Sequence, residues 1–331
     1  MNKLFFSKNK WELSLLALLI LEIMTFGIIN SRFLKINVLL NSANDFVTIA
    51  IIALFMTFVI ITGGIDISVG SIVGLSSVVM GLAWQELGVN IWVAVIFAIF
   101  VAALCGAFNG FIIAYIGVQA MVATLGTSFL YAGLSLIIIG FTGMSPAEGI
   151  TGFPELFREI GHGEVLGVPS SVIIFTILVI LTYILLHRTM YGRKVILTGI
   201  NPNAARFSGI DTKLIILSTH ILVGIGSAIS SIYITSYLSS SRADHGATLT
   251  LAIITAVVLG GTSITGGEGS ILGTTLASII IGLMTLGLQM TGLSTQYVGI
   301  GIGLLLIISV SIKTVLSGKN LIELFKKKFK I

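Results

Sequence analysis

The sequence predicts an all-α, polytopic membrane protein. Hydrophobic residues make up 56% of the 331 residues and charged residues only 9%, whereas roughly 25% of the residues in soluble domains are charged. The apolar residues gather in runs of about 20, the length that a helix needs to cross a bilayer. Basic residues flank these runs mainly on one side, which is how a membrane protein sets its orientation. We therefore interpret residues 1–331 as one transmembrane domain.

About ten apolar runs follow one another along the chain and are candidate spans. Their approximate ranges are 12–30, 46–62, 70–86, 91–116, 120–141, 167–187, 214–238, 247–262, 270–290 and 295–313. The first run follows three lysines, but no convincing small-residue cleavage site comes after it, so it is interpreted as a retained span rather than a signal peptide. The second, third, eighth and ninth runs are short and interrupted by glycine.

The distribution of positive charge predicts that both termini are cytoplasmic. With this topology only four of the 18 Lys and Arg residues lie outside, namely Arg32, Lys35, Arg158 and Arg242. The basic tail, 313–331, then lies inside, as does the polar loop 188–213. This bias towards the inside is typical of a multi-pass protein of a bacterial inner membrane.

The loop 188–213 contains five basic residues and one acid, Asp211. Its centre has the pattern of a short helix, in which an Asn caps the start, a Pro occupies the first turn and a Gly ends it. The residues are Asn201, Pro202, Asn203, Ala204, Ala205, Arg206, Phe207, Ser208 and Gly209. We interpret this helix as a docking element for a soluble partner, with Arg206 and Phe207 as its ionic and apolar anchors. The alternative for Arg206 is an orientation charge at the lipid surface.

The longest external loop, 142–166, is acidic, and its core from Phe153 to Ile160 has the apolar spacing of a helix. Two interpretations remain open. The helix is either a docking surface for an external partner or a cap that seals the bundle.

Two glycine-rich blocks resemble each other, each with a Gly-Gly pair followed by Gly-Ser-Ile-x-Gly. Internal repeats with glycine-broken segments in matching places indicate a transport pathway, although small residues also allow close helix packing. The candidate residues are Gly63, Gly64, Asp66, Ser68, Gly70 and Gly74 in the first block, and Gly260, Gly261, Gly266, Gly269 and Gly273 in the second.

Several chemistries are missing from the sequence. Only one acid, Glu22, lies near the middle of a candidate span, whereas an ion-driven carrier usually has paired ionisable groups there. No glycine-rich stretch ends in Gly-Lys-Ser or Gly-Lys-Thr, so the chain cannot hydrolyse ATP itself. The four histidines lack the spacing of metal ligands, and the lone Cys105 excludes an intrachain disulfide. The sequence therefore predicts neither an enzyme nor a metal or cofactor site.

Most of the remaining polar groups in the candidate spans are neutral, which suits an uncharged, sugar-like solute better than an ion. Taken singly, each is better explained by a hydrogen bond between helices than by a contact with the solute. The residues selected as a possible solute path are Asn44, Asp45, Asn109, Gln119, Thr124 and Gln289.

Three motifs resemble those of the ribose-type permeases, the membrane subunits of ATP-binding-cassette (ABC) sugar importers. They are ITGGIDISVGSIVGLSS within Val59–Ser77, AIITAVVLGGTSITGGEGSILG at Ala252–Gly273, and GINPNAARFSGI around the short cytoplasmic helix. The resemblance covers nearly the whole chain. It implies that the short helix couples to a separate ABC ATPase subunit.

Three further stretches resemble the branch of this family that imports autoinducer-2, a quorum-sensing signal. They are WELSLLALLILEIMTFGIIN, EGITGFPELF and SYLSSSRADHGATL. This resemblance implies a heterodimer with a C-type paralogue, a periplasmic solute-binding protein and transport by alternating access. The alternatives are import of ribose or another monosaccharide by the same architecture and, in a different class, an ion-coupled secondary carrier.

Overall fold

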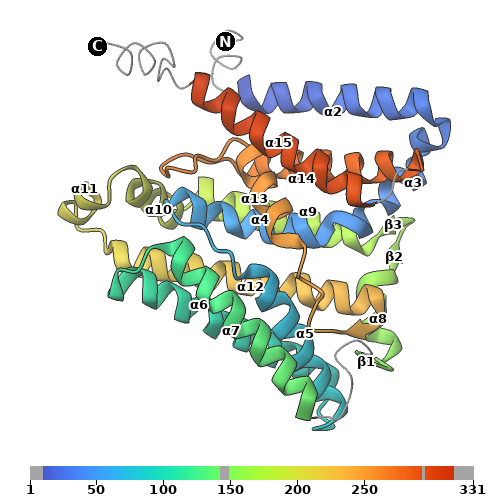
Figure 1. Cartoon of the computed structure of the whole chain (residues 1–331), viewed down its shortest axis with the longest axis horizontal. Coiled ribbons are helices and arrows are strands. Elements are labelled where there is room, and N and C mark those ends of the chain that lie inside the picture. Colours follow the sequence, from blue (N-terminus) through green and yellow to red (C-terminus); the bar gives the residue numbers. More distant parts are fainter. Residues whose placement is uncertain (1–9, 142–148, 293–294, 317–331) are drawn as a thin grey trace.

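The computed structural model describes residues 10–141, 149–292 and 295–316, which form a bundle of helices (Figure 1). The long helices are α2 (Lys10–Ile29), α4 (Ala43–Ile61), α5 (Val69–Gln85), α6 (Ile91–Phe111), α7 (Ala120–Phe141), α9 (Ser170–His187), α12 (Thr212–Leu238), α13 (Leu249–Leu259), α14 (Ile271–Met290) and α15 (Thr295–Leu316). Shorter elements join them: η1 (Ser31–Leu34), α3 (Ile36–Asn41), η2 (Ile112–Ile116), α8 (Glu155–His162), α10 (Met190–Ile200) and α11 (Pro202–Phe207). Two antiparallel pairs of short strands complete the fold, β1 (Ile150–Thr151) with β4 (Ser240–Ser241), and β2 (Glu164–Val165) with β3 (Val168–Pro169).

The predicted all-α membrane fold is confirmed. Among the described residues, seven helices are long and apolar enough to cross a membrane, and α5 and α13 are shorter apolar helices. With α15, a helix of 22 residues, they correspond one by one to the ten predicted spans. The protein is therefore a multi-pass membrane protein.

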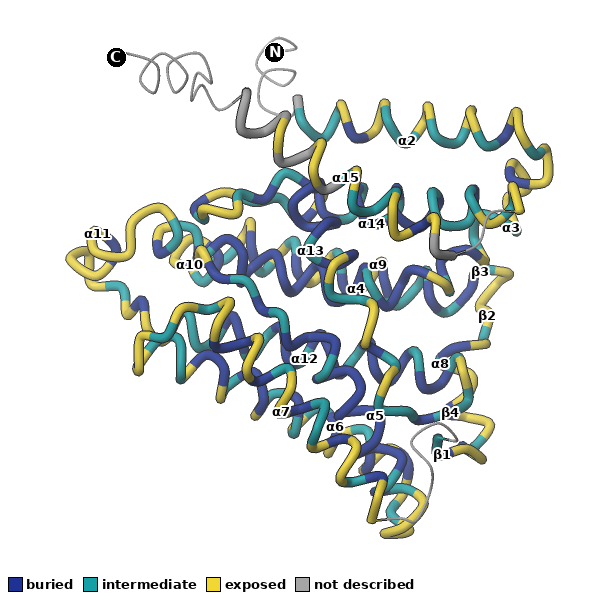
Figure 2. Tube along the Cα trace, in the orientation of Figure 1, coloured by how far each residue is buried: buried dark blue, intermediate teal, exposed yellow. Residues whose placement is uncertain are grey.

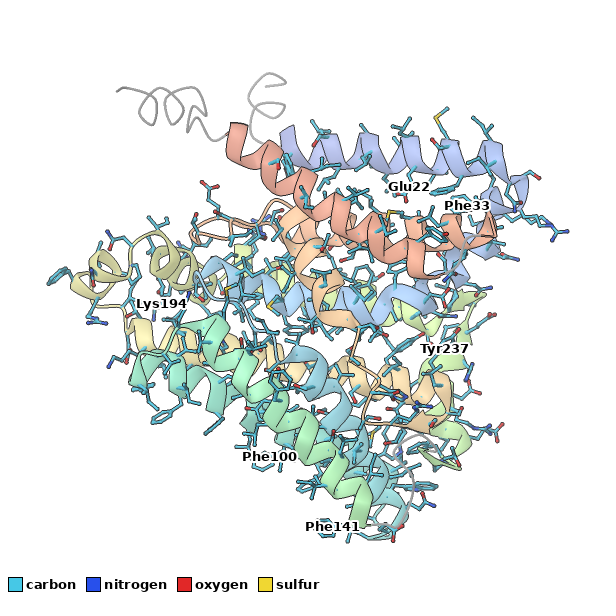
Figure 3. The ribbon with its side chains drawn as sticks, viewed as in Figure 1. Glu22, Phe33, Phe100, Phe141, Lys194 and Tyr237 are labelled. Atoms are coloured by element: carbon cyan, nitrogen blue, oxygen red, sulfur yellow. The ribbon has the colours of Figure 1, made fainter. Side chains whose placement is uncertain are left out.

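The two ends of the bundle carry different elements. Helices α10 and α11 lie at one end, near Lys194, whereas α8 and the short strands lie at the other, near Tyr237 (Figures 1 and 3). The start of α2 and the end of α15 point towards the α10–α11 end. This arrangement agrees with a topology in which both termini and the 188–213 loop share one side of the membrane.

Helix α4 is the centre of the bundle. Of its most apolar window, 83% is buried inside the protein, compared with 11% for α2 (Figure 2). Helices α9, α12, α13 and α14 all pack against α4. By contrast, α6 and α7 expose large apolar side chains on their outer faces, among them Phe100 at 56% and Phe129 at 73% exposed. Such faces are compatible with lipid, because a bilayer core accepts apolar side chains.

Helix α8 closes one end of the bundle. Phe157 is fully buried, and the backbone N–H of Gly161 donates to Ser236 Oγ on α12 at 2.8 Å. These contacts favour the capping interpretation of the external loop. Docking of an external partner on the exposed side of α8 stays a prediction, and residues 142–148 of that loop lie outside the described residues.

Candidate functional site: the α10–α11 surface and the glycine junction

Helix α11 forms as the sequence predicts. The side chain of Asn201 accepts hydrogen bonds from the backbone N–H groups of Asn203 and Ala204, at 3.0 and 3.1 Å. Pro202 occupies the first turn, where its missing N–H costs nothing. Gly209 ends the helix with φ +82°, a left-handed conformation that favours glycine.

The surface of α11 is open to solvent. Of the nine predicted coupling residues, only Ala205 is buried, and it is the residue that packs the helix onto the bundle. Phe207 is 92% exposed, and Arg206 beside it is also exposed. No ion pair is found for Arg206 among the described residues. A fully exposed aromatic ring next to an unpaired cation is typical of a surface that another protein covers.

Helix α10 connects α11 to the membrane domain through Gly199. A Cβ atom added to Gly199 would overlap the carbonyl oxygen of Ile61, the last residue of α4, and would lie 2.5 Å from the backbone nitrogen of Gly267. The N–H of Gly267 also donates to the Ile61 carbonyl oxygen at 2.8 Å. Only glycine therefore allows the end of α10 to reach the backbone at this place.

We call this contact the glycine junction and define it by Ile61, Gly63, Gly199, Gly266 and Gly267. At this junction the two predicted glycine blocks meet, because Gly266 lies against both the Ile61 carbonyl oxygen and the backbone nitrogen of Gly63. Gly199 and Ile61 were not among the predicted site residues. A glycine within a helical stretch beside the coupling motif was the available signal for Gly199, whereas nothing in the sequence marks the carbonyl of Ile61.

The first glycine block holds a buried carboxylate, Asp66, which is 0% exposed. Its Oδ1 accepts from the Ser68 backbone N–H at 2.9 Å and from Ser68 Oγ at 2.6 Å. Its Oδ2 accepts from Asn109 Nδ2 at 3.2 Å. Thr124 of α7 also binds this loop, because its Oγ1 donates to the Ile65 carbonyl oxygen and accepts from the Ile67 N–H. These bonds hold the non-helical segment 62–68 between α6 and α7, directly before α5 begins.

The six residues predicted as a solute path do not converge on one site. Asn109 and Thr124 surround Asp66, as described above. Asn44, at the start of α4, accepts hydrogen bonds from Ser171 and from Tyr233. The other three residues, Asp45, Gln119 and Gln289, are exposed and lie near helix ends. Their contact with a solute stays a prediction, although Asn44 and Asn109 have the interhelical hydrogen bonds of the alternative interpretation.

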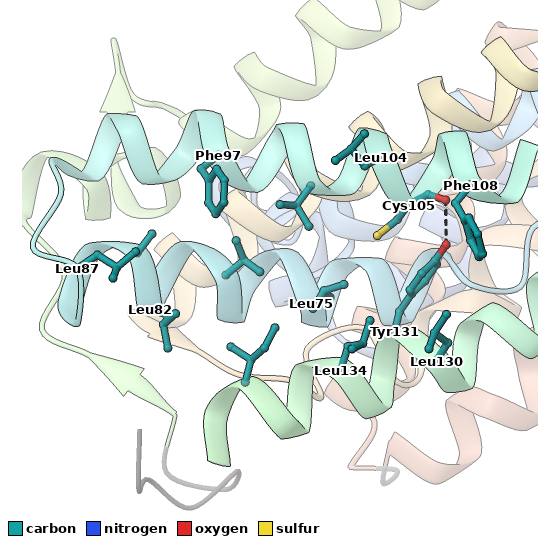
Figure 4. Close-up of a pocket in the computed structure, with 14 residues that line it drawn as sticks. Leu75, Leu82, Leu87, Phe97, Leu104, Cys105, Phe108, Leu130, Tyr131 and Leu134 are labelled. Carbon is teal, nitrogen blue, oxygen red and sulfur yellow. Dashed lines mark hydrogen bonds between the residues drawn. The ribbon is translucent and has the colours of Figure 1, made fainter. Parts of the chain in front are cut away.

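An apolar groove of about 570 Å³ lies between α5, α6 and α7 (Figure 4). Its lining consists of aliphatic and aromatic side chains together with Cys105 and Tyr131. The Tyr131 hydroxyl lies 2.9 Å from the Cys105 carbonyl oxygen and 3.1 Å from Asn109 Oδ1, so its one proton is already used. This groove therefore offers no free hydroxyl donor to a sugar-like solute.

Comparisons with known proteins identify the class of protein. The family model described as branched-chain amino acid transport system / permease component matches residues 38–310. The chain belongs to this permease family. It is 45% identical to the autoinducer 2 import system permease protein LsrD of Yersinia enterocolitica, over 94% of each chain. It is 44% identical to the LsrD proteins of Yersinia pestis and Yersinia pseudotuberculosis, over 94% of this chain and 93% of theirs. No solved structure matches.

Membership of this family confirms the predicted resemblance and assigns the chain the role of a transport subunit, not an enzyme. The match covers α4 to α14 and most of α15, so it includes both the coupling surface and the glycine junction.

Proposed function

We infer that this chain is the D-type permease subunit of an ABC importer that carries autoinducer-2, a small sugar-like solute, inward across the bacterial inner membrane. The identity of 44–45% over 94% of the chain to LsrD permeases supports this choice of solute. In this proposal the chain pairs with a C-type permease, receives the solute from a periplasmic binding protein and is driven by a separate ABC ATPase. The N- and C-termini face the cytoplasm.

The observation that carries the coupling part of the proposal is the exposed pair Arg206 and Phe207 on α11. The ATPase subunit binds this surface. When ATP closes the two ATPase subunits, α11 moves and pulls α10 with it. Gly199 of α10 contacts the backbone at Ile61, the end of α4, and at Gly267, in the loop before α14. A displacement of α10 therefore moves both of these segments together.

The solute is tested by uptake of labelled autoinducer-2 and labelled ribose in cells that express the complete transporter, with and without this gene. Loss of autoinducer-2 uptake alone supports the proposal. Loss of ribose uptake alone would support the same ABC permease architecture with ribose as the solute. Uptake that follows an ion gradient and persists without the ATPase would contradict the ABC mechanism and favour a secondary carrier.

The coupling surface is tested by a double variant, Arg206→Glu with Phe207→Ala. We expect at least about a tenfold loss of ATPase co-purification and of uptake, because the variant removes an aromatic anchor and reverses a charge at one interface. Folding is unaffected, since both side chains are exposed. The matched control is Arg158→Glu with Leu156→Ala on α8, another exposed cation and apolar residue, which lie at the opposite end of the bundle. Intact ATPase binding by the α11 variant would exclude this surface as the docking site.

A further inference from the structure

The segment that joins α12 to α13 runs into the bundle without forming a helix. It begins with β4, which pairs with β1 at the α8 end of the molecule. From there it follows α5: Ser241 Oγ donates to the Ser77 carbonyl oxygen at 2.6 Å, and the Arg242 N–H donates to Ser77 Oγ at 3.2 Å.

Two glycines of α5 allow this segment to lie directly on the helix. A Cβ atom on Gly74 would overlap the carbonyl oxygen of Ala243, and one on Gly70 would overlap that of Gly246. Ser77 lies eight residues before the end of α5 and Gly70 fifteen residues before it. At 1.5 Å per residue, the segment descends from about 12 Å to about 22 Å along the α5 axis from its external end. With the end of α5 taken as the outer surface of the membrane, residues 242–248 lie within its apolar thickness.

Two charged side chains of this segment are exposed. Arg242 donates two hydrogen bonds to Asp244, from Nε to Oδ1 at 2.9 Å and from Nη2 to Oδ2 at 2.7 Å. Their side chains are 36% and 57% exposed. Thr248, further along the segment, is exposed as well. Neither charges nor non-helical backbone tolerate contact with acyl chains, so at this depth they line a water-filled space.

Further polar atoms gather behind the ion pair. Ser77 Oγ lies 2.7 Å from Thr235 Oγ1 and 3.4 Å from His245 Nδ1. Within the described part of the chain, His245 Nε2 and Ser76 Oγ have no hydrogen-bond partner although both atoms are buried. Buried polar atoms are normally satisfied, and a polar ligand or water would supply what these two lack.

We propose that Arg242–Thr248 lines the outer half of the solute pathway and that the Arg242–Asp244 pair binds the hydroxyl groups of a neutral polyol. This inference rests on the proposed function, because it names the residues that meet the solute. A bidentate ion pair offers N–H donors on one side and carboxylate acceptors on the other, which matches hydroxyl groups that both donate and accept. The pair carries no net charge, so it binds a neutral solute without attracting ions.

Cysteine labelling tests the accessibility of the segment independently of the solute's identity. In a Cys105→Ala background, Asp244→Cys and Thr248→Cys in the complete transporter are treated from outside with a membrane-impermeant methanethiosulfonate reagent. Phe129→Cys on the outer, apolar face of α7 is the control, because that side chain is 73% exposed on a surface that is compatible with lipid. We expect the two segment positions to react and the control to stay unmodified. Loaded binding protein slows the reaction at Thr248→Cys, the variant that keeps the Arg242–Asp244 pair.

Three results would overturn the pathway assignment. The segment cysteines stay unmodified, or Thr248→Cys reacts at the same rate with and without loaded binding protein. Alternatively, they react in the isolated chain but not in the complete transporter, which would make this face a contact with the second permease. If the intact transporter imports no autoinducer-2, the proposed function fails, whereas labelling by the hydrophilic reagent still decides whether the segment lines the pathway.

Charge variants test the role of the ion pair. Asp244→Asn should raise the KM for uptake about tenfold, the cost of one hydrogen bond to a charged group. Exchange of the two charges, Arg242→Asp with Asp244→Arg, separates structure from binding. A purely structural pair regains normal uptake after the exchange, which would refute solute binding. A pair that binds the solute does not, because the donors and acceptors have changed places.

Discussion

The two glycine-rich blocks share a sequence pattern but differ in what surrounds them. In the first block the acid, Asp66, is fully buried and accepts three hydrogen bonds. In the second block the acid, Glu268, is exposed. The first block follows the long, buried α4 and continues into the first turns of the shorter α5, whereas the second follows the 11-residue α13 and continues into the first turn of the long α14.

Glycine spacing and side-chain chemistry therefore have different effects on the two blocks. In both blocks the glycines bring backbone against backbone, at Gly70 with Gly246 and at Gly273 with Gly260. The depth of each loop depends instead on whether its acid finds donors, since a buried carboxylate is tolerated only when it is hydrogen-bonded. Asn109 of α6 supplies a donor to the first block, and no hydrogen bond to the Glu268 side chain is found among the described residues.

The largest loss of stability is expected at the glycines that bring backbone against backbone in both blocks. Gly70→Val and Gly273→Val each place a side chain on a carbonyl oxygen of the neighbouring backbone, so each should lower the free energy of unfolding by about 3 kcal/mol. The control is Gly133→Val on α7, where a Cβ atom meets nothing within 4 Å. Unfolding by SDS in mixed micelles measures the difference. Equal stability of the Gly70 and Gly133 variants would mean that close backbone approach is not required.

A smaller loss of stability should distinguish the first block from the second. Asp66→Ala removes the acceptor of the Ser68 N–H and hydroxyl and one of the two acceptors of Asn109 Nδ2, which keeps Ser68 Oγ, and should cost about 2 kcal/mol in the same assay. Asp66→Asn keeps an acceptor for Ser68 but presents its amide donors to Asn109, so its loss should be intermediate. Glu268→Ala should change the unfolding curve little, because the side chain is exposed. A similar loss for both alanine variants would refute the difference between the blocks.

The smallest loss of stability is expected at the first turns of α5 and α14. Ser270 caps α14, because its Oγ accepts from the Gly273 N–H at 3.1 Å, whereas Ser68 makes no side-chain cap to α5 and donates to Asp66 instead. Ser270→Ala should therefore destabilise α14 by about 1 kcal/mol. Hydrogen exchange should quicken at the first amides of α14. In Ser68→Ala the exchange should quicken in the 62–68 loop, and the reverse pattern would contradict this assignment.

The sequence by itself determined the features that depend on local composition. The series of apolar helices and the capped helix at Asn201–Gly209 were predicted correctly, because hydrophobic length and capping act within one segment. The orientation inferred from the bias of basic residues stays a prediction. The resemblance of the glycine blocks to a permease family was also readable from adjacent residues and was confirmed by the family match.

Only the tertiary structure decided which distant residues meet. Gly199 meets Ile61 and Gly267, and Arg242 meets Ser77, across separations of more than 60 residues. The predicted solute-path residues were chosen for polarity alone, and the structure distributes them over both ends of the bundle. Arg242 and Asp244 were absent from that set, because the sequence alone does not show how deep in the membrane a charged loop residue lies. Depth follows from packing, since glycines in α5 let a segment over 160 residues further along the chain lie directly on its backbone.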